Sequence, residues 1–511
     1  MVFTGKTVQI VTKGETMSRI YKNYIHGEWI NSSSGEVFED RNPARWKEVV
    51  GVFPKSTKKE VDLAVKSARE AYHEWRKVPV PQRGEIMKKA ADIMVEQKEK
   101  IARVMTQEMG KVIAETRGDV QEGIDTAYYA FGESRRMFGQ TVPSELPNKF
   151  NMTTRQPVGV AGLISPWNFP IAIPSWKIFP ALTCGNTVVF KPASDTPASA
   201  TLLVEILLAA GIPPLAINLV HGTGAGVGVP LVEHPDIDLI SFTGSSSVGK
   251  IICEKAAKQL KRVSLELGGK NAQIVLADAN LNLALEGVLW GAFGTTGQRC
   301  TATSRLILHE KIHNKFLEML IESTEKLKLG NGLDETVHIG PVINKGQLEI
   351  IAHYVEIGKQ EGATVVTGGK PAEQGDLGEG FFFQPTIFAG VNRKMRIARE
   401  EIFGPVLSVI KVSSVDEAIE VLNDTDYGLS SSIYTQDVNL AYRAIRDIQA
   451  GITYINGPTI GAECHMPFGG VKETGNGHRE GGWSAYEFFS ETKTVYVDFS
   501  GKLQRAQIDN R

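Results

Sequence analysis

Residues 187–214 read TVVFKPASDTPASATLLVEILLAAGIPP, and this stretch decides the fold. It begins with a short apolar run at 187–190, which is typical of a buried strand. Thr196 can cap a following helix, Pro197 suits the first turn of that helix, and Gly211 ends it before two prolines that forbid its continuation. The stretch therefore predicts one strand followed directly by one helix.

The same alternation continues on both sides of this unit. Strands that alternate with helices form βαβ units, so a mainly parallel sheet is expected. A second alternating block starts near Asn271, with helices predicted over 281–296 and 313–328. We therefore predict an α/β protein with two domains that meet near 267–271. The apolar runs that act as strands in the two blocks are 158–164, 187–190, 217–220, 239–242, 263–265, 273–276 and 306–309.

The flanking regions add smaller elements. Residues 24–30 alternate around Gly27 and predict a short β-element. Thr57-Lys58-Lys59-Glu60 fits a capping box, and the apolar spacing behind it predicts an amphipathic helix, as do residues 85–138. Residues 492–499 are typical of an extended strand, and residues 1–20 of a loose leader.

Composition narrows the class of protein. A chain of 511 residues predicts about three structural units. The net charge of −2 gives no basic field, so nucleic acid and anionic membranes are not expected partners. Four scattered cysteines without zinc-ligand spacing argue against a disulfide framework and against a metal site. With no apolar signal region and no membrane-length apolar run, a reducing, cytoplasmic compartment is expected.

Three short motifs carry the chemistry. Cys300 ends the polar turn Gly297-Gln298-Arg299-Cys300, and Glu266 lies between two leucines just before Gly268-Gly269. A nucleophilic cysteine needs a partner that handles protons and lies near it in space rather than in sequence. Asn168, in Pro166-Trp167-Asn168-Phe169-Pro170, offers an amide to an oxyanion.

With these motifs in order, the chain from about Tyr24 to about Tyr496 resembles the NAD(P)-dependent aldehyde dehydrogenase superfamily. The resemblance implies that Cys300 attacks an aldehyde, while Asn168 and the Cys300 backbone N–H hold the oxyanion. It implies that Glu266 activates water to hydrolyse the thioester. Glu480 matches a position that can serve a proton relay in relatives; a surface ion pair is the alternative.

The resemblance also implies an architecture. Two α/β domains with mainly parallel twisted sheets and a small β arm are expected. Residues 1–138 and 157–267 would form a Rossmann-like cofactor-binding domain, and 268–483 a catalytic domain. Residues 139–156 and 484–500 would form an oligomerisation arm, which implies a homodimer or homotetramer.

The expected cofactor is NAD or NADP. Gly244 and Ser245 follow a strand and open a helix, whose free N–H groups suit a pyrophosphate. By resemblance, Lys191 holds the adenosine ribose, Glu401 the nicotinamide ribose, and Phe403 packs near the ring. The full set of expected cofactor residues is Ile164, Pro166, Trp167, Lys191, Ser194, Gly224, Phe242, Gly244, Ser245, Val248, Leu267, Gly268, Glu401 and Phe403.

Ser194 departs from many NAD-preferring relatives, which carry a glutamate at this position. A carboxylate there would repel a 2′-phosphate, whereas a serine beside Lys191 removes that repulsion. We therefore expect NADP to be accepted, although the adjacent Asp195 can restore negative charge.

The loop with Gly461-Ala462 before Pro467 is similar to that of the 2-oxoglutaric and aminoadipic semialdehyde dehydrogenases. Small residues let backbone N–H groups approach a carboxylate closely; a plain turn is the alternative. The prediction is oxidation of a carboxylate-bearing semialdehyde, such as 2-oxoglutaric semialdehyde. The expected substrate-binding residues are Phe169, Trp176, Arg299, Thr301, Gly461, Ala462 and Phe468.

Three alternatives remain open at this point. One is a broad oxidiser of aliphatic or aromatic aldehydes. Another passes the thioester to coenzyme A, although relatives of that kind tend to lack a glutamate at position 266. The third is a non-catalytic structural protein on the same fold.

Overall fold

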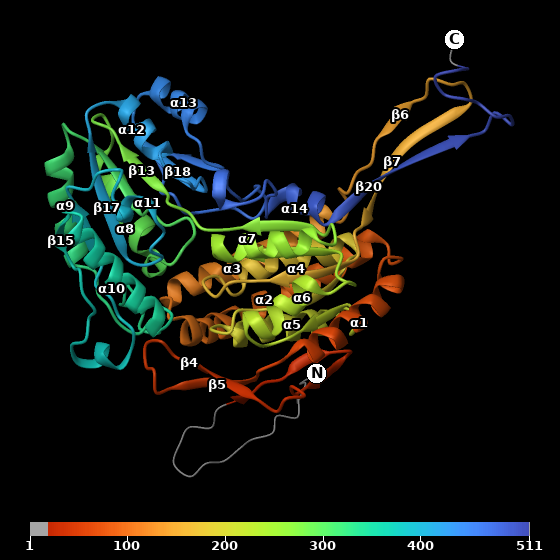
Figure 1. Ribbon diagram of the computed structural model, residues 1–511, viewed down its shortest axis with the longest axis horizontal. Coiled ribbons are helices and arrows are strands. Elements are labelled where there is room, and N and C mark those ends of the chain that lie inside the picture. The colour runs from red at the N-terminus through yellow and green to blue at the C-terminus, as the bar shows by residue number, and fades with distance from the viewer. Residues whose placement is uncertain (1–18, 510–511) are drawn as a thin grey trace.

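The computed structural model describes residues 19–509 of the chain, so most of the leader predicted over 1–20 lies outside the described residues. Two sheets of seven strands each form the body, and a three-stranded sheet projects from it (Figure 1). A small sheet of β1 (Arg19–Ile20), β5 (Val49–Pro54) and β4 (Val37–Arg41) lies at the N-terminal end. Within the described residues, no helix has both the length and the apolar character needed to cross a membrane.

The first large sheet is parallel except at one edge, where the short β-element predicted over 24–30 is an antiparallel hairpin of β2 and β3. Three of its inner strands, β8, β9 and β11, are buried on both faces, as their continuous apolar runs indicated. In spatial order they are β12 (Arg262–Glu266), β11 (Leu239–Thr243), β8 (Val160–Ile164), β9 (Thr187–Lys191), β10 (Ile217–Leu219), β2 (Asn23–Ile25) and β3 (Glu28–Ile30).

Successive side chains of a strand point to opposite faces of the sheet. Both faces of this sheet carry apolar side chains, and helices cover both. Leu163 and Phe190 pack in the core with α2, α3, α4, α5 and α14. Ile164 and Val189, one position away, pack with α1, α6 and α7 on the other face. These helices are α1 (Lys58–Trp75), α2 (Val80–Met109), α3 (Ile113–Glu133), α4 (Ala172–Cys184), α5 (Pro197–Ala210), α6 (Val229–Glu233), α7 (Ser246–Ala257) and α14 (Gly482–Phe488).

The strand order places a site at one edge of this sheet. From β8 the chain proceeds to β9 on one side and later to β11 on the other. Open α/β sheets bind ligands at the carboxyl ends of strands where the order reverses in this way. Ile164, Lys191, Thr243 and Glu266 end β8, β9, β11 and β12 at this edge.

The second large sheet is parallel except for the edge pair β15–β16. Its strands are β15 (Thr364–Thr367), β16 (Thr386–Ala389), β17 (Val406–Val412), β14 (Arg305–His309), β13 (Ala272–Val275), β18 (Ser430–Tyr434) and β19 (Ile452–Ile455). One core packs against α8 and α9, the other against the remaining helices of this unit. These are α8 (Leu281–Phe293), α9 (His313–Glu325), α10 (Lys345–Gln360), α11 (Arg396–Arg399), α12 (Val415–Asn423) and α13 (Val438–Asp447).

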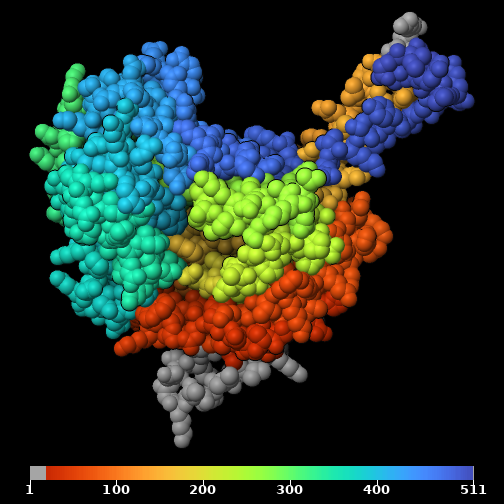
Figure 2. Space-filling view, in the orientation of Figure 1, coloured from red at the N-terminus to blue at the C-terminus, as the bar shows by residue number. Residues whose placement is uncertain are grey.

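The third sheet is a long arm of β6 (Thr141–Pro143), β7 (Lys149–Pro157) and β20 (Ser490–Asp498). β20 and β7 pair antiparallel along nine residues of each strand. The arm stands clear of the body (Figure 2). The strand predicted over 492–499 is therefore present, displaced by one to two residues.

The sequence predicted N-terminal caps for two helices, α1 and α5, and only the first is present. The capping box of Thr57 and Glu60 is confirmed at the start of α1. The cap predicted from Thr196 is wrong, because its side chain makes no capping bond. Instead, the Glu108 carboxylate of α2 accepts hydrogen bonds from the N–H groups of Ala198 and Ser199, both at 2.8 Å. The Glu108 carboxylate therefore caps α5, in place of the Thr196 hydroxyl that the local pattern predicted.

The helix predicted over 281–296 is also too long. α8 ends at Phe293, and residues 294–297 form a tight turn in which Thr295 and Thr296 have φ values of 53° and 57°. Left-handed conformations in non-glycine residues cost of order 1–3 kcal/mol each. Such strain persists only where neighbours enforce it, and those neighbours belong to the site described next.

Candidate active site

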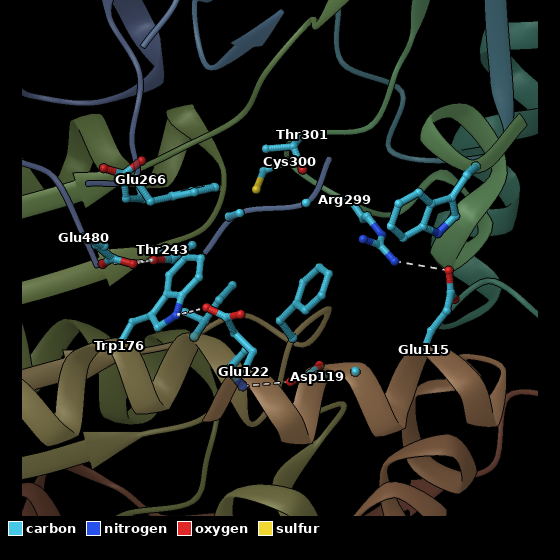
Figure 3. Close-up of a pocket in the computed structure, with 18 of the residues that line it drawn as sticks. Glu115, Asp119, Glu122, Trp176, Thr243, Glu266, Arg299, Cys300, Thr301 and Glu480 are labelled. Carbon is cyan, nitrogen blue, oxygen red and sulfur yellow. Dashed lines mark hydrogen bonds and ion pairs between the residues drawn. The ribbon is translucent and has the colours of Figure 1, made fainter. Parts of the chain in front are cut away.

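Two cavities meet at Cys300. The larger, of about 370 Å³, lies between α3 and α4 on one side and the segments around 299–301 and 461–468 on the other (Figure 3). The second, of about 240 Å³, opens at the carboxyl ends of β8 and β11. Cys300, Ile173 and Thr243 line both cavities. The thiol can thus be approached from two directions, as a reaction between two bound molecules requires.

The predicted site residues divide between these cavities. The larger one is lined by Phe169, Trp176, Glu266, Arg299, Cys300, Thr301, Gly461, Ala462, Phe468 and Glu480. The second one is lined by Pro166, Trp167, Asn168, Gly244, Ser245, Leu267, Gly268, Glu401 and Phe403. Six of the expected cofactor residues line neither cavity: Ile164, Lys191, Ser194, Gly224, Phe242 and Val248.

The turn before Cys300 is held by both halves of the molecule. The Glu115 carboxylate of α3 accepts hydrogen bonds from the Thr295 N–H at 2.8 and 2.9 Å. Thr296 Oγ1 donates to the Gly340 carbonyl at 3.0 Å. The Cys300 carbonyl accepts from Asn271 Nδ2 at 2.7 Å, from the segment that links the two large sheets. These bonds account for the strained threonines.

The Cys300 thiol lies in a negative environment. Burial raises its pKa to about 12, and the carboxylates of Glu401 and Glu266 act in the same direction. At neutral pH the thiol is therefore protonated, and a base must take its proton during attack.

Glu266 lines the larger cavity together with Cys300. It ends β12 and is 2% exposed, and neither carboxylate oxygen has a hydrogen-bond partner among the described residues. Burial raises its pKa well above the ordinary range, and the Glu480 carboxylate raises it further, while Lys177 and Arg479 oppose the shift. A carboxylate with a raised pKa is a stronger base near neutral pH.

Behind Glu266 lies a buried polar network. Glu480 forms an ion pair with Lys177, and it accepts a hydrogen bond from Ser241 Oγ at 3.2 Å. Thr243 Oγ1 also contacts this carboxylate, at 3.4 Å. Because Glu480 is 5% exposed, the surface ion pair that the sequence left open is wrong. The pair is internal, and Glu480 borders the larger cavity (Figure 3).

Asn168 lies four residues after the end of β8 and is 3% exposed. Its Nδ2 donates to the Gln298 carbonyl at 3.0 Å. An amide nitrogen carries two hydrogens, so one fixes the side chain and one remains for an oxyanion at Cys300.

The second cavity suits a dinucleotide. The N-terminus of α7, capped by Ser245, offers N–H groups and a positive dipole end. Glu401 accepts from the Gly269 N–H at 3.0 Å, and burial raises its pKa to about 7. Phe403 and Trp167 meet edge to face at 5.4 Å. This combination of phosphate-binding helix, carboxylate for sugar hydroxyls and aromatic surface fits a nicotinamide cofactor.

The residues expected at the adenosine end lie along the neighbouring strands. Lys191 ends β9 and is 6% exposed, and burial lowers its pKa to about 8. Ser194 Oγ donates to the Gly222 carbonyl at 3.0 Å. The Asp195 carboxylate, which the sequence flagged as a possible negative neighbour, accepts from Asn344 Nδ2 at 3.0 Å.

Sequence reasoning missed an acidic face of α3. Glu115, Asp119 and Glu122 all line the larger cavity. Asp119 accepts from Lys111 Nζ and from the Ala172 N–H at the start of α4, both at 2.7 Å. The spacing of four and three residues on a predicted helix was the available signal.

Each outer carboxylate of this face has its own partner. Glu122 accepts from Trp176 Nε1 at 3.0 Å, and burial raises its pKa to about 7. Glu115 pairs with Arg299 Nη2 at 3.1 Å, and Arg299 Nε donates to Thr295 Oγ1 at 2.8 Å (Figure 3). With Glu266 and Glu480, the lining of the larger cavity therefore carries five carboxylates and one guanidinium.

These features define an oxidoreductase site in which a thiol, a buried base and an oxyanion donor adjoin a dinucleotide cavity. The chain belongs to the aldehyde dehydrogenase family: the model described as "Aldehyde dehydrogenase family" matches residues 29–495. It is an NAD(P)-dependent aldehyde dehydrogenase, and the predicted family and fold class are confirmed.

The proteins that this chain resembles do not all carry the same substrate in their names. The chain is 44% identical to the alpha-ketoglutaric semialdehyde dehydrogenase of Bacillus subtilis (strain 168), covering 94% of this chain and 99% of that one. It is 42% identical to aldehyde dehydrogenase 1A1 of Rattus norvegicus, with 94% and 95% covered. A betaine aldehyde dehydrogenase structure from Staphylococcus aureus, in complex with NAD+, superposes with a TM-score of 0.92 at 35% identity, covering 94% of this chain and 95% of that one. Identity alone therefore does not choose the aldehyde.

Proposed function

We propose that this enzyme oxidises an aldehyde that carries a carboxylate at its far end, with 2-oxoglutaric semialdehyde as the substrate. The observation that carries the proposal is Arg299. Among the described residues that line the larger cavity, it is the only cationic side chain. Because Arg299 directly precedes Cys300, a short aldehyde can reach the thiol at one end and the guanidinium at the other.

The guanidinium has capacity for this role. Nε and one hydrogen of Nη2 are engaged by Thr295 and Glu115. Arginine carries five N–H donors, so donors on Nη1 remain for a carboxylate in charge-assisted bonds. The backbone at Gly461 and Ala462 lines the same cavity and can add N–H donors.

Negative charge elsewhere in the cavity points the anionic end toward Arg299. Glu122 lines the cavity beside Trp176. Burial raises the pKa of Glu122, and the nearby Glu463 carboxylate raises it further. An anion is disfavoured beside them and favoured at the guanidinium. The relative from Bacillus subtilis, named for alpha-ketoglutaric semialdehyde, supports the same choice.

We propose the following first step. The Cys300 sulfur forms a bond to the aldehyde carbon, and its proton passes to Glu266. The oxygen becomes an oxyanion held by Asn168 Nδ2 and the Cys300 backbone N–H. Bound NAD(P)+ supplies a hydride acceptor. Loss of hydride from the carbon leaves a thioester on Cys300.

The second step is hydrolysis of this thioester. Glu266 must first release its proton, and the internal Glu480–Lys177 pair behind it offers a route. Glu266 then removes a proton from water, and the resulting oxygen attacks the thioester carbon. The carbon–sulfur bond breaks, the Cys300 sulfur takes back the proton that Glu266 holds, and the carboxylic acid is released. The raised pKa of Glu266 suits both proton transfers.

For the cofactor, we propose that the α7 N-terminus holds the pyrophosphate. Lys191 and Glu401 would bind the two riboses, and Ser194 would permit a 2′-phosphate. We further propose a homodimer or homotetramer built through the arm, and a reducing, cytoplasmic location, consistent with four unpaired cysteines.

The test compares Arg299→Met with wild type on 2-oxoglutaric semialdehyde and on pentanal. We expect kcat/KM for the acid to fall 10- to 100-fold, because charge-assisted hydrogen bonds contribute about 1.5–3 kcal/mol. Pentanal should lose several-fold less than the acid, because for pentanal only the bonds of Arg299 to Thr295 and Glu115 are lost. Glu335→Gln, on an exposed ion pair of α3, is the control. Equal losses on both aldehydes would contradict the anchor, and wild-type preference for pentanal would indicate a general aldehyde oxidiser.

A further inference from the structure

The strained turn at 294–297 is held from outside its own unit. Cys300 and the turn belong to the chain between α8 and β14, whereas Glu115 lies in the first turn of α3, among the helices of the first sheet. Glu115 makes three kinds of bond to this segment: to the Thr295 N–H, to Thr295 Oγ1 at 3.3 Å and to Arg299 Nη2.

The contact is close and shielded from water. The Glu115 and Arg299 side chains are 13% and 12% exposed, and Thr295 and Thr296 are each 2% exposed. A side-chain carbon added at Gly294 would lie 3.0 Å from Glu115 Oε1, so the turn packs directly against the carboxylate. A partly buried carboxylate that accepts several N–H and O–H donors fixes its partners much more firmly than an exposed ion pair does.

The nucleophile follows this turn after two residues. Gln298 and Arg299 separate it from Cys300, and Gln298 is bound on its carbonyl by Asn168 and on its side chain by the Ile343 N–H at 3.0 Å. A change in the turn would therefore displace both the thiol and the oxyanion donor.

We propose that Glu115 is a positioning residue that holds the turn 294–297 in its left-handed conformation and thereby keeps Cys300 at the junction of the two cavities. Glu115 acts through Thr295 and does not touch the reacting atoms. The proposal rests on Cys300 as the nucleophile, but not on the identity of the aldehyde.

Helix α3 also supplies a matched control. Two residues from Glu115, Arg117 pairs with Glu335 of the second unit at 2.8 Å. This pair crosses between the same two units but is exposed, with Glu335 at 64%, and it does not contact the turn. Glu335→Gln therefore removes a contact between the units and leaves the turn intact.

The experiment measures two quantities in Glu115→Ala and Glu335→Gln: kcat and KM for pentanal, and the rate at which iodoacetamide alkylates the Cys300 peptide, followed by mass spectrometry. Pentanal avoids any effect of Arg299 on an anionic substrate. Because small misplacements of reacting groups cost about 100-fold, we expect kcat in Glu115→Ala to fall at least 10-fold with KM changed less than threefold. Alkylation should change at least fivefold, and Glu335→Gln should match wild type.

A second variant tests the strain directly. Glycine adopts positive φ without penalty, so Thr295→Gly should reduce the need for Glu115. In the Glu115→Ala background, it should restore kcat at least threefold. The proposal is overturned if Glu115→Ala stays within twofold of wild type, if Glu335→Gln shows the same losses, or if Thr295→Gly brings no recovery.

If Glu115→Ala does not fold, Glu115→Gln carries the test, because it keeps an oxygen for the Thr295 N–H but loses the charge. A kcat reduced at least threefold, with altered alkylation, supports the proposal. Wild-type values for both overturn it. Complete loss of turnover in Cys300→Ser separately tests the nucleophile on which the proposal rests.

Discussion

The side chain of Asn168 and the carbonyl of Gln298 are joined by a hydrogen bond of 3.0 Å. Asn168 follows β8 of the first sheet, and Gln298 lies two residues before Cys300. The proposed oxyanion donor and the nucleophile are therefore fixed to each other across the boundary between the two units, before any substrate binds.

This bond gives the first prediction. Asn168→Ala should lower kcat by about 10²–10³, because loss of one oxyanion donor has that effect in other enzymes. Asn168→Asp has nearly the same shape but lacks the N–H, so it should lose as much. Steady-state rates with pentanal measure both variants. Full activity in Asn168→Asp would show that the amide only supports the loop.

The second prediction concerns pH. Burial, and then the Glu480 carboxylate, raise the pKa of Glu266. A general base works only when deprotonated, so kcat should fall as pH drops through this raised pKa. Glu480→Gln removes the negative neighbour, lowers the pKa of Glu266 and should move the acid limb of the profile to lower pH.

The pH profile of kcat between pH 5 and 9 checks this shift. Glu335→Gln, which alters a distant exposed carboxylate, should leave the limb in place. A limb that moves to higher pH in Glu480→Gln would reverse the assigned interaction, and an unmoved limb would remove Glu266 as the group that titrates.

The third prediction concerns how residue 194 distinguishes NADP, which carries a 2′-phosphate, from NAD. Ser194→Glu places a carboxylate beside Lys191, which should repel a 2′-phosphate and lower kcat/KM for NADP at least 10-fold. NAD should be used as well as before or better. Ser194→Ala removes the hydroxyl without adding charge and separates the two effects. Unchanged NADP use in Ser194→Glu would place the 2′ position elsewhere.

The fourth prediction compares two glycines with positive φ, Gly469 beside Glu266 and Gly211 far from the site, for their effects on stability and on turnover. Gly469 has φ of +148°, and a side-chain carbon there would collide with Glu266 Oε1. Gly469→Ala should therefore lose stability, by about 1–3 kcal/mol, and also turnover. Gly211 has φ of +100° with open space around it, so Gly211→Ala should lose stability alone. Denaturant unfolding together with kcat distinguishes them, and equal turnover in both variants would contradict contact with the base.

The sequence predicted features that depend on local pattern. The run at 187–190, Pro197 and Gly211 were enough for a strand, a helix start and a helix end, because period and backbone preference are local properties. The resemblance of whole motifs also predicted the family. In contrast, the helix cap from Glu108 joins residues 90 positions apart, and no local pattern reports such a pair.

The site shows the same limit. Sequence placed Cys300, Glu266 and Arg299 in chemical roles, and the structure brings them to one cavity. It predicted neither the left-handed threonines nor the carboxylate that holds them, because the local pattern favours a helix through 296, and the contacts with Glu115 and Gly340 come from distant parts of the chain. Glu115 and Thr295 are 180 positions apart in the sequence, so their hydrogen bond forms only in the folded protein.

The buried, negatively surrounded thiol has one more consequence. Peroxides and disulfides react with thiolates, and a cysteine whose pKa is raised to about 12 presents almost none at neutral pH. We therefore expect Cys300 to react slowly with peroxides until a base removes its proton. The carboxylates that raise the pKa of this thiol would then also slow its oxidation.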